Sequence, residues 1–255
     1  GHGRQSTFTI RRLTMSIAIK QIKTRLGRDY TVVDDANFIK RHFGTYCSSS
    51  TYQINNLKFL KKIRSHYNLI IDVGANWGMN TVEYSHFSDS VVSFEPYPDL
   101  YQLLLKNIQQ NGCEKQVETY PYALHHSDIR YAMSWHHNGL SNRYNPTKGS
   151  VTVDSKCLDD FNLQPDVIKI DTEGTEWYVI QGADQTIQRH RPICQIELDR
   201  HWIKYGINIQ DLFDYFLDLD YVCVDKKHRQ YRSYEKVSRQ MDRFFIPRET
   251  YDALK

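Results

Sequence analysis

The chain alternates short apolar runs with segments in which apolar residues recur every three or four positions. The apolar runs predict strands over residues 69–73, 91–95, 117–121, 166–171, 192–198, 221–224 and 243–246. The helical spacing predicts helices over residues 79–87, 98–110, 175–187 and 209–217. Strands that alternate with helices are typical of an α/β domain in which helices cover both faces of a largely parallel sheet.

The first part of the chain has a different pattern, which is basic and partly helical. A short amphipathic segment is predicted by Ile17, Ile19, Ile22 and Leu26. A second helix is predicted over residues 52–63 and leads into the first strand of the sheet. We therefore divide the chain into an N-terminal extension or cap, residues 1–65, and one catalytic domain, residues 66–255.

The alternation changes between residues 129 and 153, where two strand-like runs enclose a polar loop. The runs are residues 131–135 and 151–153. Loops that are held by rigid strands often determine specificity, so we expect the substrate to contact this segment. The candidate residues for that contact are Trp135, His136, His137, Ser141 and Arg143.

The stretch Asp72–Gly78 reads Asp-Val-Gly-Ala-Asn-Trp-Gly and joins the first strand of the predicted sheet to a helix. Glycine lets a ligand approach the bare backbone, and the start of the helix presents N–H groups to it. The second strand ends in Glu95, where an acidic side chain can hold ribose hydroxyls. A nucleoside cofactor fits both features, although the Gly-x-Gly-x-x-Gly pattern of pyrophosphate-binding turns is absent. The alternative is an ordinary strand–helix turn with two solvated carboxylates.

These segments resemble the FkbM-type family of class I S-adenosylmethionine-dependent methyltransferases. The motifs that carry the resemblance are Asp72–Gly78, Phe94–Pro96, Cys157–Asp160, Ile168–Glu176, Gln181–Ala183, Arg191–Pro192 and Phe244–Pro247. The resemblance covers about residues 69–250 and leaves the N-terminal region out. It implies a Rossmann-like sheet of seven mostly parallel strands with the last strand antiparallel. It also implies O-methylation of a hydroxyl, often on a sugar or another natural product.

The same resemblance implies a set of cofactor contacts. The residues that would bind S-adenosylmethionine are Asp72, Gly74, Ala75, Asn76, Gly78, Glu95, Pro96, Ala123 and Leu124. Carried over by position, the residues of the glycine-containing turn would surround the methionine part of the cofactor. Glu95 would hold its ribose, and the segment at Ala123 would line the edge of its adenine.

Methyl transfer to a sugar hydroxyl requires help with the proton, because such a hydroxyl has a pKa far above 7. Candidate carboxylates stand where two neighbouring parallel strands end, and they are Asp171, Glu197 and Asp199. One hypothesis is general base catalysis by Asp171, by Glu197 or by one of the histidines His136, His137 and His201. The alternative is a Mg²⁺ or Mn²⁺ ion held by Asp171, Glu197 and Asp199, since hard cations prefer oxygen ligands.

Composition adds expectations about partners and location. A formal charge of +3 over 255 residues is mild, so a nucleic-acid partner is not expected. The sequence has no run of about 18 apolar residues, so we expect no membrane span. The five cysteines form no Cys-x-x-Cys pair, which favours a reducing, cytoplasmic compartment.

The function that we expect from the sequence is O-methylation of a sugar hydroxyl in a glycan or a glycosylated metabolite, with S-adenosylmethionine as the methyl donor. Three alternatives stay open: an RNA ribose methyltransferase, a nicotinamide-dependent oxidoreductase and a non-catalytic binding module. Only the basic segments of the chain favour RNA. An oxidoreductase would share the first turn and Glu95, but it gives no reason for the motif Asp171–Gly174.

Overall fold

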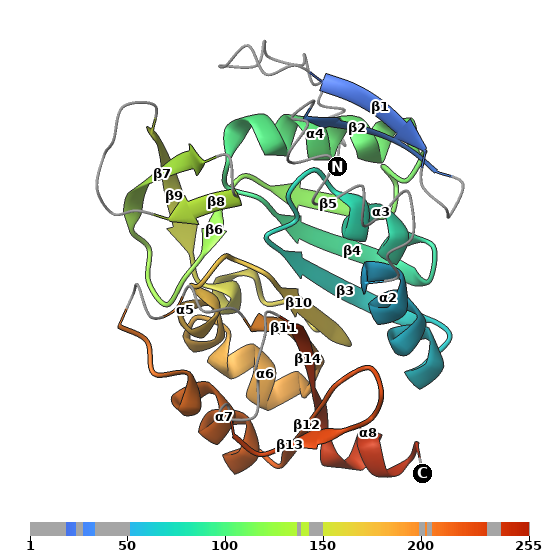
Figure 1. Ribbon diagram of the computed structural model, residues 1–255, viewed down its shortest axis with the longest axis vertical. Helices are drawn as coiled ribbons and strands as arrows, with labels where there is room; N and C mark the ends of the chain where they lie inside the picture. Colours follow the sequence, from blue (N-terminus) through green and yellow to red (C-terminus); the bar gives the residue numbers. More distant parts are fainter. Residues whose placement is uncertain are drawn as a thin grey trace, which may run out of the picture.

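A sheet of eight strands forms the centre of the part of the protein that the computed structural model describes (Figure 1). The structure describes residues 19–23, 28–33, 52–136, 139–142, 150–198, 202, 206–233 and 241–254. The strands of this sheet are Tyr67–Val73 (β3), Ser88–Phe94 (β4), Val117–Tyr120 (β5), Val167–Ile170 (β10), Ile193–Leu198 (β11), Tyr221–Val224 (β12), Gln230–Tyr231 (β13) and Met241–Pro247 (β14). Their order across the sheet is β13-β12-β14-β11-β10-β3-β4-β5.

The pairing of these strands confirms the expected Rossmann-like sheet. Strands β5, β4, β3, β10 and β11 pair in parallel, and β14 lies antiparallel between β11 and β12. Seven strands are therefore mostly parallel, and the last of them in the chain runs antiparallel. The short strand β13 pairs with β12 and adds an eighth strand that the sequence pattern does not predict.

Helices cover both faces of the sheet (Figure 1). They are Tyr52–Ile63 (α2), Met79–Ser85 (α3), Pro98–Gln110 (α4), Glu176–Gln181 (α5), Asp184–His190 (α6), Ile209–Asp218 (α7) and Arg248–Asp252 (α8). Ile70 and Ile71 are neighbours on β3 and point to opposite faces, as strand geometry requires. Ile70 packs with side chains of α2 and α3, and Ile71 packs with side chains of α5, α6 and α7.

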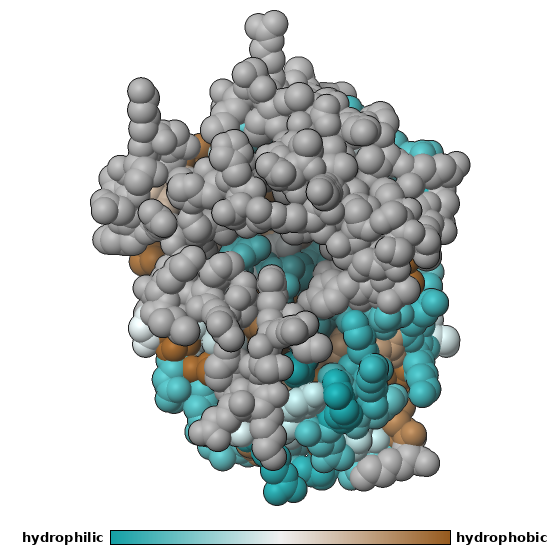
Figure 2. Space-filling view, viewed as in Figure 1, coloured by the Kyte–Doolittle hydropathy of each residue, from teal (hydrophilic) through white to brown (hydrophobic). Residues whose placement is uncertain are grey.

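The surface of the described part is mainly polar. Ile129 is the one large apolar side chain there that is exposed. Figure 2 shows hydrophilic side chains over the lower part of the molecule, with apolar residues scattered among them. Among the helices that the structure describes, none has the length and apolar character of a membrane span.

A second, smaller sheet lies beside the carboxyl ends of β3 and β4 (Figure 1). Its strands are Ala123–Leu124 (β6), Arg130–His136 (β7), Gly139–Asn142 (β8) and Ser150–Lys156 (β9), in the order β6-β9-β7-β8. The two predicted strands around the polar loop are confirmed, and part of the loop is itself strand β8. Of the predicted loop residues, Trp135 and His136 lie on β7 and Ser141 lies on β8. His137 and Arg143 fall outside the described residues.

The predicted helix over residues 175–187 is divided into α5 and α6. Gly182 follows α5, and a Cβ atom at this position would lie 2.0 Å from the carbonyl oxygen of His125. The chain that leaves β6 therefore crosses directly against this glycine. The apolar spacing continues across the break, so the sequence pattern alone predicts one helix.

The N-terminal extension contains a β-hairpin, which corrects the expectation of an amphipathic helical segment there. Strands Ile19–Lys23 (β1) and Asp29–Val33 (β2) pair antiparallel, with Ile19 opposite Val33. β-branched residues suit this pairing, and contacts with distant parts of the chain can override local helical spacing. Ile17 and Leu26 fall outside the described residues. The second predicted helix, α2, is confirmed with its expected bounds.

Candidate active site

The carboxyl ends of β3, β4, β10 and β11 lie along one edge of the sheet, because these strands are parallel. The turn after β3, Glu95, Asp171 and Glu197 all come from this edge. In Figure 2, which has the orientation of Figure 1, hydrophilic side chains are recessed at the centre of the face where β3 and β4 end. Ligands of open α/β sheets bind at such an edge.

The turn after β3 has an unusual backbone. Gly74, Asn76 and Gly78 all have positive φ angles, at 72°, 56° and 89°. The N–H groups of Gly74 and Ala75 donate to the carbonyl oxygen of Phe94 at 3.0 Å, and Gly78 N–H donates to the Ala75 carbonyl at 2.9 Å. The first two bonds fasten the turn to the end of β4, and the third closes the turn on itself. Turns with such left-handed residues can present backbone N–H groups to a ligand.

The glycines of this turn are also required by the protein itself. A Cβ atom at Gly74 would lie 1.9 Å from the carbonyl oxygen of Asp171, and one at Gly78 would lie 2.5 Å from Cδ1 of Leu104 on α4. The space beside each glycine is therefore filled by protein atoms. Both glycines are therefore required by packing within the protein, whether or not a ligand binds the turn.

Glu95 is buried at the end of β4, with 2% of its surface exposed. Its Oε2 accepts the backbone N–H of Asn76 at 2.8 Å, and its Oε1 accepts that of Tyr97 at 2.8 Å. Burial raises the pKa of Glu95 to about 7, against the opposing effect of the two backbone hydrogen bonds. The carboxyl thus ties the turn after β3 to the end of β4 and changes protonation near neutral pH.

The other predicted cofactor residues differ in exposure. Pro96 is half-buried, whereas Ala75, Ala123 and Leu124 are buried. The side chain of Leu124 belongs to the main apolar core. A ligand at this edge would therefore meet the backbone of Leu124 rather than its side chain.

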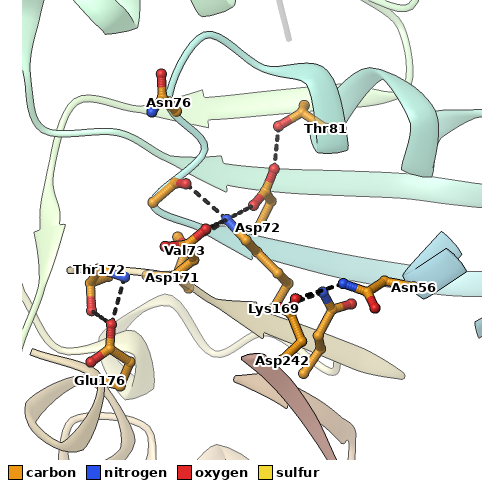
Figure 3. Close-up of polar contacts among 12 residues, drawn as sticks. Asn56, Asp72, Val73, Asn76, Thr81, Lys169, Asp171, Thr172, Glu176 and Asp242 are labelled. Atoms are coloured by element: carbon orange, nitrogen blue, oxygen red, sulfur yellow. Dashed lines mark hydrogen bonds and ion pairs between the residues drawn. The ribbon is translucent and has the colours of Figure 1, made fainter. Parts of the chain in front are cut away.

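Asp72 and Lys169 form a buried ion pair beneath the turn (Figure 3). Lys169 Nζ lies 3.1 Å from Asp72 Oδ1 and donates to the Gly74 carbonyl at 2.9 Å. The other Asp72 oxygen accepts the hydroxyl of Thr81 at 2.7 Å. Burial alone would lower the pKa of Lys169, but Asp72 and Asp171 outweigh it and raise the pKa. Both oxygens of Asp72, a predicted cofactor contact, thus face protein partners.

Three carboxylates converge next to this ion pair. Single oxygens of Asp171, Glu173 and Glu197 all lie within 4.8 Å of one another, and Asp171 Oδ2 is 3.6 Å from Lys169 Nζ. Burial first, and then the neighbouring Asp171, raises the pKa of Glu197 well above its usual range. A hydrogen bond with Asp171 also raises the pKa of Glu197 and so favours its protonated form.

The structure therefore brings together two of the predicted catalytic residues, Asp171 and Glu197. It adds Glu173 to them, because the loop after β10 folds back with a φ of 58° at this residue. Asp199 and His201 fall outside the described residues.

Glu176 holds the loop after β10 in place. It is 1% exposed, and its Oε1 accepts the backbone N–H of Thr172 at 2.9 Å (Figure 3). The same oxygen accepts the backbone N–H of Gly174 at 3.1 Å. Burial raises the pKa of Glu176 to about 7, although these backbone hydrogen bonds lower it. The side chain thus fixes the segment that carries Asp171 and Glu173.

Two residues of this region, Lys169 and Asp242, were not recognised from the sequence as part of the site. Asp242 lies opposite Glu197 in the β11–β14 pair, and its charge contributes to the raised pKa of Glu197. Its Oδ2 accepts from the side chain of Asn56 on α2 at 2.7 Å, and its Oδ1 from Gln195 at 3.1 Å. For Lys169 the available signal was a charged residue within an otherwise apolar strand, whereas Asp242 stands beside Arg243, before the apolar part of β14.

Comparison with known proteins places this geometry in a family. The family model described as the methyltransferase FkbM domain matches residues 72–223. No curated protein sequence matches the chain. Among solved structures, the chain is similar to the methyltransferase FkbM from Methylobacillus flagellatus KT, with 19% identity and a TM-score of 0.50. That match covers 71% of this chain and 44% of the other, so the chain spans less than half the length of that protein.

Two further solved structures are similar at lower levels. The ribosomal protein L11 methylase from Lactobacillus delbrueckii subsp. bulgaricus has 10% identity and a TM-score of 0.46, with 78% of this chain and 80% of that chain covered. The TehB-like SAM-dependent methyltransferase from Corynebacterium glutamicum has 10% identity and a TM-score of 0.45, with 78% of this chain and 90% of that chain covered. Because the FkbM family model spans more than half of the chain, this protein belongs to the FkbM methyltransferase family.

Proposed function

We propose that the chain is an S-adenosylmethionine-dependent O-methyltransferase that methylates a sugar hydroxyl in a glycan or a glycosylated metabolite. The observation that carries the proposal is the hydrogen-bonded pair Asp171–Glu197 at the sheet edge that also holds the turn after β3. One part of this edge suits a nucleoside cofactor, and the neighbouring part suits the removal of a proton.

The residues at this edge fit the cofactor. The turn Gly74–Gly78 offers a backbone with repeated positive φ angles, and its amides are held by the end of β4. Glu95 has a buried carboxyl at the strand end, where ribose hydroxyls can donate to it. The backbone of β6 would lie along the adenine. When bound, the cofactor supplies a methyl group on a sulfonium, which is a good leaving group.

An alcohol acceptor fits the carboxyl pair because an aliphatic hydroxyl has to lose its proton as the new bond forms. In the proposed step the acceptor oxygen would take the methyl group from the sulfonium, which leaves as the thioether, and an ionised carboxylate of the pair would accept the hydroxyl proton. Glu197 suits this role because its raised pKa makes it a stronger base than an ordinary carboxylate. Lys169, whose Nζ lies 3.6 Å from Asp171 Oδ2, stabilises the negative charge of the ionised form of the pair that accepts this proton.

A sugar suits the site better than an isolated alcohol. Asp171, Glu173 and Glu197 present several acceptor oxygens within a small space, and neighbouring sugar hydroxyls can donate to more than one of them. We also assign acceptor contacts to the small sheet, where Trp135 and His136 lie on β7. The same carboxylate oxygens suit Mg²⁺ or Mn²⁺, so a metal-assisted version of the reaction is the alternative to a protein base.

Two measurements test the proposal. Isothermal titration with S-adenosylhomocysteine and with NAD separates a methyltransferase from a nicotinamide-dependent enzyme, and we expect binding of the first alone. A screen with labelled S-adenosylmethionine then compares monosaccharide glycosides, oligosaccharides and RNA as acceptors. Label in a glycoside or an oligosaccharide supports the proposal. Label only in RNA would show that the acceptor is RNA and not a sugar. Binding of neither cofactor would contradict the proposed function and favour the alternative of a non-catalytic binding module.

A further inference from the structure

The N-terminal hairpin is joined to the turn after β3 through one side chain of α4. Asn107 is fully buried, and its Oδ1 accepts the backbone N–H of Thr31 on β2 at 2.7 Å. Its Nδ2 donates to the Thr31 carbonyl at 2.9 Å and to the Trp77 carbonyl at 2.7 Å. One amide thus uses its acceptor and both of its donors to bind strand β2 and the turn together.

A second contact between β2 and this region runs through Tyr30. The side chain is fully buried, and its ring meets that of Trp77 edge-on, with 5.5 Å between the ring centres. Its hydroxyl donates to Glu83 on α3 at 3.0 Å, and Arg28 pairs with the same Glu83 oxygen at 2.9 Å. Strand β2 therefore contacts both the turn and the helix that follows it. In Figure 1 the hairpin lies along α4, on the side away from the sheet.

Trp77, which both contacts reach, stands in the part of the turn where the backbone is left-handed. It lies between Asn76, with a φ of 56°, and Gly78, with a φ of 89°. A left-handed conformation at a residue other than glycine is costly and persists only when its surroundings hold it. The N–H of Asn76 is also the group that binds Glu95. A shift at Trp77 would therefore disturb the bond that ties the turn to Glu95, the proposed ribose-binding residue.

We propose that strand β2, acting through Asn107 and Tyr30, holds the turn Gly74–Gly78 in the conformation that binds S-adenosylmethionine. Tyr30 and Thr31 lie outside the part of the chain that the family model matches, residues 72–223. The N-terminal extension thus contributes positioning residues to a site built by the catalytic domain. This inference rests on the proposed function, because it takes the turn to be the cofactor site.

The expected effect is on cofactor affinity more than on the chemical step. A turn that is already held in its binding conformation does not have to be ordered when the ligand binds. The entropy cost of binding is then smaller, so the affinity is higher. The carboxyl pair Asp171–Glu197 stands at the ends of β10 and β11, whereas the contacts of β2 described above run to α4, α3 and the turn, so we expect the step at the acceptor hydroxyl not to depend on the hairpin directly. Loosening the hairpin should raise KM for the cofactor and leave kcat nearly unchanged.

The test compares Asn107→Ala and Tyr30→Leu with Gln110→Ala in the full chain. Gln110 accepts from the hydroxyl of Thr31 at 3.1 Å, so its loss removes a contact between α4 and the hairpin other than those of Asn107 and Tyr30 with Trp77. We expect both test variants to bind S-adenosylhomocysteine about tenfold more weakly, on the scale of a lost preorganising contact, and Gln110→Ala to bind like wild type. Amides of residues 75–78 should exchange hydrogen faster in the test variants alone.

Each result has a defined meaning. Wild-type affinity in folded Asn107→Ala and Tyr30→Leu overturns the inference, and so does an equal loss in Gln110→Ala, because the effect would then not run through Trp77. Where Asn107→Ala does not fold, Tyr30→Leu decides, since it leaves the hydrogen bonds of Asn107 in place. A wild-type chain that does not bind S-adenosylhomocysteine contradicts the proposed function instead, so the two failures are distinct.

Discussion

Gly74 and Asp171 lie at the ends of neighbouring parallel strands, and the carbonyl oxygen of Asp171 occupies the space in which a side chain at residue 74 would begin. The distance from that oxygen to an ideal Cβ atom at residue 74 is 1.9 Å. The turn after β3 and the loop after β10 are therefore packed together through their backbones. A change in one of them moves the other, and with it the carboxyl of Asp171.

The first prediction is that Gly74→Ala destabilises the fold as well as weakening cofactor binding. The new Cβ clashes with the Asp171 carbonyl, and alanine at a φ of 72° adds strain, so we expect a loss of about 2 kcal/mol or more. Gly112→Ala is the matched control, because Gly112 has a φ of 66° but no atom within 4 Å of its Cβ position. It should lose only about 1 kcal/mol, the cost of the backbone strain alone. Equal losses in urea denaturation would contradict the clash.

The second prediction concerns the ion pair beneath the turn. Lys169→Met should cost about 3–5 kcal/mol of folding free energy, because it leaves the fully buried Asp72 carboxylate without its cation. The double variant Lys169→Met with Asp72→Asn should recover part of that loss. Chemical denaturation of the wild type, both single variants and the double variant measures the coupling. Additive losses would show that the two side chains do not stabilise each other.

The main strands, and the sheet edge at which the candidate site lies, could be predicted from the sequence because both follow regular rules. Apolar runs located the main strands, since a parallel strand that is covered on both faces consists largely of apolar residues. The parallel order then places the ends of β3, β4, β10 and β11 at one edge, so Asp171 and Glu197 could be expected close together. To predict that these two carboxylates lie close together, only the order and the direction of the strands have to be known.

Other features depend on contacts between distant parts of the chain. The isoleucines of Ile19–Lys23 have a spacing that a helix would also show, and only the pairing with Asp29–Val33 makes this segment a strand. Glu173 joins the carboxylates because the loop after β10 reverses at a left-handed residue, which periodicity does not indicate. Asn107 appears in the sequence as an ordinary polar residue of a helix, and its three bonds to other segments become visible only in three dimensions.

The third prediction concerns Glu95 and the pH dependence of cofactor binding. Since the pKa of Glu95 is about 7, the carboxyl is largely protonated at pH 6 and accepts ribose hydroxyls best above pH 7. Affinity for S-adenosylhomocysteine should therefore rise from pH 6 to pH 8 in the wild type. Glu95→Gln should weaken binding at pH 8 by about 1–3 kcal/mol and remove most of this pH dependence. Titration calorimetry at the two pH values measures both effects, and a variant with the wild-type profile would exclude Glu95 from the ribose site.

The fourth prediction concerns stability and Glu176. Its pKa is about 7 in the folded protein, above the ordinary value of 4.5, so the folded state keeps a proton that the unfolded state has lost between these pH values. This contribution is complete below about pH 4.5 and is lost as the pH rises to about 7, which makes stability fall with pH across this window. The loss for this group is at most about 3 kcal/mol.

Glu176→Gln removes the titrating group while keeping an oxygen that accepts the backbone N–H groups of Thr172 and Gly174. The variant should therefore lose less stability than the wild type between pH 5 and pH 7.5, as followed by urea denaturation at a series of pH values. Gln188→Ala, on the exposed face of α6, serves as a control that should keep the wild-type slope. A Glu176→Gln slope equal to that of the wild type would mean that Glu176 is already ionised at pH 5.

The last prediction concerns proton removal by the Asp171–Glu197 pair. Asp171→Asn and Glu197→Gln should each lower kcat by about 10²–10⁴-fold while the affinity for S-adenosylhomocysteine changes little, because the pair acts on the acceptor and not on the cofactor. Since burial and the neighbouring Asp171 raise the pKa of Glu197, the basic form accumulates only as the pH rises above the usual carboxyl range. The wild-type rate should therefore increase with pH, and Glu197→Gln should flatten that increase.

Removal of metal ions with EDTA distinguishes metal-assisted catalysis from catalysis by a protein base. Activity that is lost with EDTA and restored by Mg²⁺ or Mn²⁺ identifies the carboxylates Asp171, Glu173 and Glu197 as metal ligands, and Glu173→Gln should then raise the concentration of metal that is needed. Activity that is indifferent to EDTA assigns the proton to the carboxyl pair itself. A kcat near wild type in both Asp171→Asn and Glu197→Gln would show that the pair is structural. The base would then have to be sought on the small sheet, beginning with His136 on β7.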